Sequence, residues 1–193
     1  RKYTRRRGPT LGVAAMAASV PPTRCWIGLS LGALLTTAPA DAQQLRGSRG
    51  TYTVSINVPV TAAKAWTVLT SYEAMAGLMP DIKQAKVLRR NDSELELAQT
   101  YQAPYTFGLP IKATLRLREQ APRNLSYSLI RGDRIRSLSG SWTITPIPGG
   151  VRVEHRIAVE PDLPSVLRPT YDELTELNLR DSMRVLKRLM LSP

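Results

Sequence analysis

The stretch TYDELTELNLRDSMRVLKRLML (170–191) decides the fold. At 100° per residue, its apolar side chains gather in one stripe and most of its charged side chains fall on the opposite side, which predicts a long amphipathic helix. Thr175, Asn178 and Ser182 occupy the middle of the apolar stripe. Dry contact with aliphatic side chains would cost roughly 1–3 kcal/mol for each unpaired polar group. We therefore expect the helix to pack on a sheet and to leave a cavity beside its middle.

The chain before this helix is dominated by apolar residues at every second position, the pattern of antiparallel strands with one buried face. After the first of these strands, helical spacing interrupts the alternation and predicts two short helices, 62–69 and 72–79. This order predicts an α+β fold with a curved antiparallel sheet of about seven strands around the C-terminal helix. The predicted strands are 51–58, 82–90, 94–102, 109–120, 124–131, 135–147 and 151–159.

The composition limits the chemistry that the chain can perform. With 193 residues, of which 42% are hydrophobic and 22% charged, it suits one domain with an appended segment. Cys25 is the only cysteine and His155 the only histidine, so the sequence excludes a disulfide framework and cysteine-rich or multi-histidine metal sites. Phosphate-binding and dinucleotide-binding glycine motifs are absent from the sequence. We expect neither a metal nor a cofactor.

The first 42 residues have the pattern of an export signal. Arg24 precedes an apolar run, 25–35, and the sequence Ala40-Asp41-Ala42 offers small residues where a signal peptidase requires them. The run is too short for a permanent membrane-spanning helix. We expect a start at Met16, cleavage after Ala42, and export of a mature domain, 43–193. The alternative is an uncleaved interfacial anchor or a disordered arm.

Short motifs mark the chain from the first predicted strand to the last helix. They are Ser55-Ile56-Asn57-Val58-Pro59-Val60, Ala65-Trp66, Leu69, Tyr72-Glu73, Leu78-Met79-Pro80, Gly132-Asp133, Gly140-Ser141-Trp142 and Gly149-Gly150. In this order they resemble the START-like (SRPBCC) superfamily, and most closely its polyketide cyclase/dehydrase and coenzyme Q-binding branch. The resemblance covers about residues 50–191. That branch often has Asp before the tyrosine of the Tyr-Glu motif, where this chain has Ser71.

The resemblance implies a helix-grip fold, in which a curved sheet wraps around the C-terminal helix and encloses an apolar cavity. Members of the superfamily bind lipids, quinones, polyketides and hormones. A few catalyse cyclisation or dehydration, and one branch is described as a ribosome-associated toxin. One fold therefore serves several functions, and the choice among them depends on the site.

The predicted cavity combines apolar walls with a few polar groups, as small-molecule sites do. From the sheet, alternation directs Gln99, Tyr101 and His155 towards the polar residues in the middle of the helix. The alternative is a filled core whose polar atoms bond to one another. The predicted walls are Trp66, Leu69, Met75, Met79, Leu97, Leu115, Tyr127, Trp142, Leu174 and Met183.

His155 is the one side chain suited to general base catalysis near neutral pH. Its period-two neighbours are apolar, so we expect it to point inward, and by strand alternation no carboxylate shares its face. It acts either as a catalytic base, with Tyr101 or Gln99, or as a hydrogen-bonded core or ligand-orienting group. Arg134 and Arg136 have the parity of the inward residues, so they either hold a ligand headgroup at the cavity rim or end a solvated strand.

The chain carries 27 basic and 15 acidic residues, a formal charge of +12. Among the outward-facing residues, Lys112, Arg116 and Arg118 on one strand and Arg152 and Arg156 on another form a basic row, which either contacts an anionic membrane or is solvated surface. Nucleic acid is not expected as a partner, because no stacking aromatic residues accompany this row.

Together these features predict an exported, monomeric protein that carries a hydrophobic small molecule, such as a lipid, a quinone or an isoprenoid-like compound, in an internal cavity. One alternative is a polyketide cyclase/dehydrase-type enzyme that uses the same cavity. A second is a ribosome-associated toxin-like protein, which the basic charge favours and the export signal disfavours.

Overall fold

The computed structural model describes residues 43–193, which form one antiparallel sheet of eight strands with helices packed against it. The predicted signal peptide, with its start at Met16 and its cleavage after Ala42, lies outside the described residues and stays a prediction. The elements are β1 (Gln44–Ser48), β2 (Thr51–Val58), α1 (Ala62–Thr70), α2 (Tyr72–Met75), β3 (Ile82–Asn91), β4 (Glu94–Tyr101), η1 (Pro104–Thr106), β5 (Ile111–Gln120), β6 (Asn124–Gly132), β7 (Ile135–Ile147), β8 (Gly150–Pro161), η2 (Ser165–Leu167) and α3 (Arg168–Leu191).

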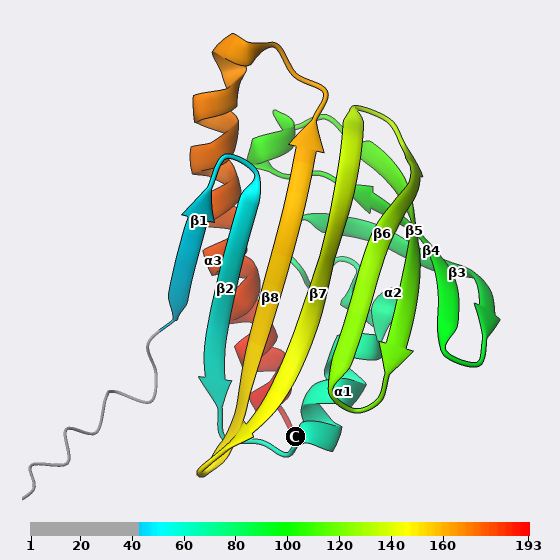
Figure 1. Cartoon of the computed structure of the whole chain (residues 1–193), viewed down its shortest axis with the longest axis vertical. Coiled ribbons are helices and arrows are strands. Elements are labelled where there is room, and N and C mark those ends of the chain that lie inside the picture. The colour runs from blue at the N-terminus through cyan, green and yellow to red at the C-terminus, as the bar shows by residue number, and fades with distance from the viewer. Residues whose placement is uncertain (1–42) are drawn as a thin grey trace, which may run out of the picture. The chain divides into compact units, whose positions relative to one another are not determined.

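The strands are ordered β1-β2-β8-β7-β6-β5-β4-β3, so each strand from β3 to β8 pairs with the next one along the chain. β2 pairs with β8, which joins the beginning of the domain to its end. The chain then enters α3, which runs behind the sheet in Figure 1, on the same side as α1 and α2. The predicted helix-grip arrangement, a curved antiparallel sheet around a long C-terminal helix, is confirmed.

β1 is a strand that the sequence did not predict. It pairs with β2 at the edge of the sheet. Because only Leu45 of its five residues is partly buried, the strand has no need of alternating apolar and polar residues, and its sequence shows none. Gly47 has a φ of +111°, and a Cβ at this position would lie 2.1 Å from the carbonyl oxygen of Thr51. This tight edge pairing therefore requires glycine.

Two hydrophobic clusters hold the layers together. In the first, β2 and β8 pack against the C-terminal half of α3 and against α1, with Leu186 and Met190 of α3 fully buried. The second lies on the inner face of the sheet around β4, β5 and β6 and includes Leu97 and Leu115. Trp142 packs against both clusters, so the space between them lies close to its indole ring.

The helices differ from the prediction mainly at α2, which ends at Met75 instead of residue 79. Gly77 has a φ of +78°, which stops a right-handed helix, and its N–H donates to the carbonyl oxygen of Ile82 at 2.7 Å. α3 has 24 residues and begins at Arg168, slightly before the predicted start. None of the helices within residues 43–193 combines the length and the apolar character needed to cross a membrane.

Candidate ligand-binding site

A cavity of about 190 Å³ lies between α3, the α1–α2 segment and the inner face of the sheet. Its walls come from residues on β3 to β8, on the helices and on the loops after α2 and β4. Most of the residues predicted for a binding site border this space. They are Leu69, Met75, Met79, Leu97, Gln99, Tyr101, Leu115, Tyr127, Trp142, His155, Thr175, Asn178, Ser182 and Met183.

Trp66, Leu174 and Arg136 were predicted for the site but do not line the cavity. Trp66 is partly buried between the two hydrophobic clusters, and Leu174 is half-buried on α3. Arg136 is exposed on the surface, where it forms an ion pair with Asp162 at 2.7 Å. Its expected inward parity was wrong because a β-bulge lies between residues 135 and 137 of β7 and reverses the alternation.

On one side of the cavity, a histidine is enclosed by aromatic side chains. The hydroxyl of Tyr127 lies 2.7 Å from Nε2 of His155, and the imidazole stacks on Trp142. Tyr127 has room to reach the histidine because Gly140 of β7 has no side chain: a Cβ there would lie 2.3 Å from the tyrosine oxygen. Burial lowers the pKa of His155 to about 3, so its ring is neutral at physiological pH.

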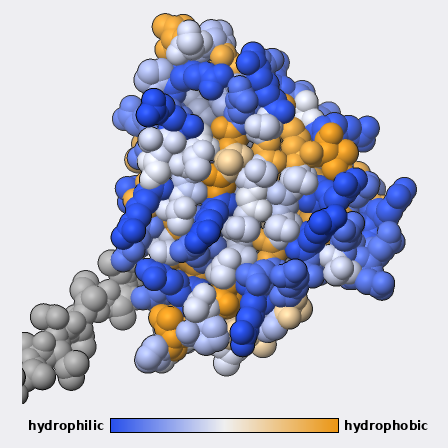
Figure 2. Space-filling model, viewed as in Figure 1, coloured by the Kyte–Doolittle hydropathy of each residue, from blue (hydrophilic) through white to orange (hydrophobic). Residues whose placement is uncertain are grey.

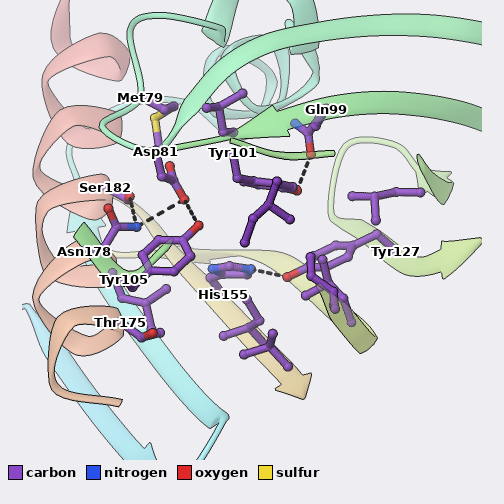
Figure 3. Close-up of a pocket in the computed structure, with 18 of the residues that line it drawn as sticks. Met79, Asp81, Gln99, Tyr101, Tyr105, Tyr127, His155, Thr175, Asn178 and Ser182 are labelled. Atoms are coloured by element: carbon purple, nitrogen blue, oxygen red, sulfur yellow. Dashed lines mark hydrogen bonds between the residues drawn. The ribbon is translucent and has the colours of Figure 1, made fainter. Parts of the chain in front are cut away.

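A cluster of polar side chains borders the cavity on the side of α3 (Figure 3). Nδ2 of Asn178 and the hydroxyl of Tyr105 both donate to Oδ2 of Asp81, at 3.1 and 3.2 Å. Nδ2 of Asn178 also lies 3.5 Å from Oγ of Ser182. Burial raises the pKa of the Asp81 carboxyl, and the hydrogen bonds from Asn178 and Tyr105 partly oppose this rise.

Asp81 is a carboxyl group that the prediction did not include, and it lines the same cavity as His155. The prediction used strand alternation only, whereas Asp81 lies in the loop before β3 and Tyr105 lies in η1. Neither segment has a periodic pattern, so the sequence held no signal that would find them. Other lining residues that the prediction omitted are Tyr72, Ile82, Ile111, Leu117, Leu125, Ile135, Leu138, Ile157, Val159, Pro161, Tyr171 and Leu179.

The remaining polar groups of the cavity are neutral hydroxyls and an amide, together with one arginine. The hydroxyl of Tyr101 donates to Oε1 of Gln99, and burial raises the pKa of Tyr101. The hydroxyl of Thr175 is buried without a hydrogen bond of normal geometry, although it lies close enough to Tyr171 to influence that phenol. Burial raises the pKa of Tyr171 to about 12. Arg134, one of the two arginines expected at the rim, does line the cavity.

This geometry suits the binding of an apolar molecule with a small number of polar atoms. Aliphatic and aromatic walls can remove an apolar molecule from water, and the groups around Asp81 and His155 offer hydrogen bonds that can orient it. Within residues 43–193, no three His, Cys, Asp or Glu side chains come together as a metal site.

Comparisons with known proteins agree with this architecture. A family model described as "Polyketide cyclase / dehydrase and lipid transport" matches residues 49–190. No curated protein sequence matches the chain. Many solved structures share its fold, among them the following three. The first, a START superfamily protein from Mycobacterium smegmatis, is 21% identical with a TM-score of 0.61, and the match covers 74% of this chain and 96% of that one.

The second is a STAR-related lipid transfer protein from Xanthomonas axonopodis, 18% identical with a TM-score of 0.61, matched over 80% of this chain and 96% of that one. The third is the Zhui aromatase/cyclase from Streptomyces sp. R1128, 14% identical with a TM-score of 0.60, matched over 77% and 94%. At these identities the similarity shows the fold alone. On the match of the family model, the chain belongs to the polyketide cyclase/dehydrase and lipid transport family.

Proposed function

We propose that this protein binds and carries a hydrophobic small molecule, of the lipid, quinone or isoprenoid-like class, in the cavity beside α3. The observation that carries this proposal is the cavity itself, which stays open between two well-packed hydrophobic clusters. Burial of apolar ligand surface contributes roughly 25 cal/mol per Å², which is sufficient to drive binding without covalent chemistry.

The size of the cavity indicates which part of a ligand it holds. At about 190 Å³ it exceeds the roughly 150 Å³ cavity that admits benzene in an engineered protein core. It therefore accommodates a substituted ring or one end of a longer chain.

The test is a search for a copurified ligand. Native mass spectrometry and solvent extraction of the purified protein should reveal an apolar compound at up to one equivalent. A second measurement uses 2-isopropylnaphthalene as an added probe, with binding followed by calorimetry. Protein that carries no extractable compound and also fails to bind the probe would contradict the proposal.

A cyclase or dehydrase activity is the second candidate function. The observation that favours it is the presence of a neutral imidazole and a carboxyl group, His155 and Asp81, on the walls of one cavity. Under this alternative, replacement of His155 by alanine abolishes turnover of a polyketide-like substrate. Under the carrier proposal, the same variant changes only the affinity, and modestly.

We also propose export, supported by the pattern of residues 24–42 in the sequence. The N-terminal sequence of the protein purified from its native cell tests this directly. A mature chain beginning at Gln43 would support export, and an N-terminus upstream of this residue in the cytosol would contradict it.

Contact with an anionic membrane is a further part of the proposed function. The outer face of the sheet is the surface that would make this contact. Figure 2 shows strongly hydrophilic side chains on this face, separated by near-neutral ones. Arg118 forms an ion pair with Glu94, and Arg156 forms one with Glu154. The basic row predicted from the sequence is therefore partly neutralised. Cosedimentation of the monomeric protein with vesicles rich in phosphatidylserine, compared with neutral vesicles, tests the contact.

A further inference from the structure

Asp81 is a carboxyl group on the cavity wall that forms no ion pair with any residue of the range 43–193. The one cation that acts on it electrostatically is Lys83, whose exposed ammonium donates to the carbonyl oxygen of Pro80 at 3.3 Å. The other titratable groups on the cavity walls are the tyrosines, the neutral His155, and Arg134.

The hydrogen bonds around Asp81 are asymmetric. Figure 3 shows Asn178, from α3, and Tyr105, from η1, converging on the same carboxyl oxygen. Both side-chain contacts, at 3.1 and 3.2 Å, reach Oδ2, and neither reaches Oδ1. The carboxyl group also interacts with the backbone N–H of Asp81 itself. An amide N–H can only donate, so the contact with Asn178 identifies Oδ2 as an acceptor.

An ionised carboxylate without a counter-ion is costly in an apolar cavity, and such groups take up a proton instead. The direction of the shift agrees, since burial raises the pKa of Asp81. In a neutral carboxyl group, one oxygen is the carbonyl acceptor and the other carries the proton. Because Oδ2 already accepts from Asn178, the proton belongs on Oδ1, which then needs an acceptor of its own.

We infer that Asp81 is the hydrogen-bond donor of the cavity and that its Oδ1–H recognises a carbonyl oxygen of the bound molecule. This inference rests on the proposed binding function and narrows the ligand to a hydrophobic ketone, quinone or ester. A carbonyl oxygen accepts without bringing a proton that would need a further partner. A ligand that carries an amine would instead require Asp81 in its ionised form.

Three probes of matched shape test the inference on the full protein: 2-acetylnaphthalene, 2-isopropylnaphthalene and 1-(2-naphthyl)ethylamine. The measured quantity is the ratio of the ketone's affinity to the hydrocarbon's. A comparison of this ratio between wild type and variants cancels the different cost of removing each probe from water. In Asp81→Leu the ratio should fall by about five- to tenfold, the worth of one neutral hydrogen bond.

The amide variant gives the sharper result. Asp81→Asn presents an N–H where the protonated carboxyl presents an O–H, and its oxygen still accepts from Asn178, so the ratio should stay within about twofold of wild type. Asp181→Leu, an exposed position on α3, is the matched control and should not change the ratio. If Asp81→Leu fails to fold, as circular dichroism would show, wild type and Asp81→Asn still decide the question with the ketone and the amine.

The outcomes separate the two proposals. Binding of the hydrocarbon, with a ketone ratio that Asp81→Leu leaves unchanged, overturns the role of Asp81 and leaves the carrier function standing. An amine that binds most tightly to wild type and loses its affinity in Asp81→Asn overturns it in favour of an ion pair. Failure of all three probes to bind wild type that carries no extractable compound overturns the carrier function, and the inference with it.

Discussion

The imidazole of His155 lies flat against the indole of Trp142, with ring centroids 3.9 Å apart and planes 1° from parallel. The two residues are direct cross-strand partners on β7 and β8, so the pairing of the last two strands sets their contact. Stacking buries one face of the histidine, and Tyr127 occupies its Nε2. The ring is thus held as a neutral, oriented group on the cavity wall.

This environment predicts a loss of stability in mild acid. The folded-state pKa of His155, about 3, lies well below its ordinary value of 6.5, so the unfolded chain binds a proton that the folded chain does not. The contribution of the neutral histidine to the free energy of unfolding is fully present above pH 6.5 and is lost as the pH falls towards 3. Between pH 7 and pH 4.5 the loss amounts to about 2–3 kcal/mol.

Denaturant unfolding of wild type and His155→Phe at pH 7 and at pH 4.5 measures this effect. Asp81 titrates in the opposite direction, because a raised pKa favours the folded state as the pH falls, so only the difference between the two proteins isolates the histidine. The wild type should lose more stability than the variant. Equal losses in the two proteins would contradict the buried, neutral state of His155.

Gly140 predicts a second measurable dependence. A Cβ at this position would lie 2.3 Å from the hydroxyl oxygen of Tyr127 and 2.4 Å from the carbonyl oxygen of Arg156. Gly140→Ala should therefore destabilise the protein by about 1–3 kcal/mol and move Tyr127 away from His155. Thermal unfolding checks the stability, and Ser139→Ala, at an exposed position on the same strand, is the control. A Gly140→Ala variant as stable as the control would show that the strand relaxes freely.

Thr175→Val should stabilise the empty protein. The Thr175 hydroxyl is buried without a hydrogen bond of normal geometry, and valine has the same shape without the polar group. Removal of an unsatisfied buried hydroxyl is worth about 1 kcal/mol, and the two residues have similar helix propensities. The midpoint of urea unfolding measures the gain. A decrease would mean that contact with Tyr171 satisfies the hydroxyl in solution.

The sequence predicted the elements that have strong periodicity and missed those that do not. The strands 51–58 and 135–147 and the long C-terminal helix follow clear apolar patterns, and the structure has them at nearly the same bounds. β1 has one apolar residue in five, so no alternating pattern in the sequence predicted this strand. The site divides in a similar way: apolar periodicity places Tyr101, His155 and Asn178 at the cavity, whereas the loop residue Asp81 depends on tertiary packing.

Arg136 shows a different limit of sequence reasoning. Alternation along β7 correctly directs Trp142 towards the cavity, but a bulge at residues 135–137 moves Ile135 inward and Arg136 outward. A bulge depends on how the partner strand β8 ends, beside Pro161, and local sequence does not encode that relation. Inward and outward assignments are thus least secure at the ends of long strands.

Two leucine-to-tryptophan variants test whether the cavity is open in solution. Leu115 and Leu186 are both fully buried, at 3% and 0% exposure, but only Leu115 borders the cavity, whereas Leu186 lies in the packed cluster between α3 and the sheet. A larger side chain in a filled core costs typically 1–3 kcal/mol or more, because neighbouring groups must move. Leu186→Trp should incur this cost. Leu115→Trp should incur much less, since the indole can enter the open volume, and it should weaken binding of 2-isopropylnaphthalene at least tenfold.

Thermal unfolding and calorimetry on both variants give the two readouts. If Leu115→Trp destabilises the protein as strongly as Leu186→Trp and leaves probe binding unchanged, the space between the clusters is closed in solution and the ligand binds elsewhere.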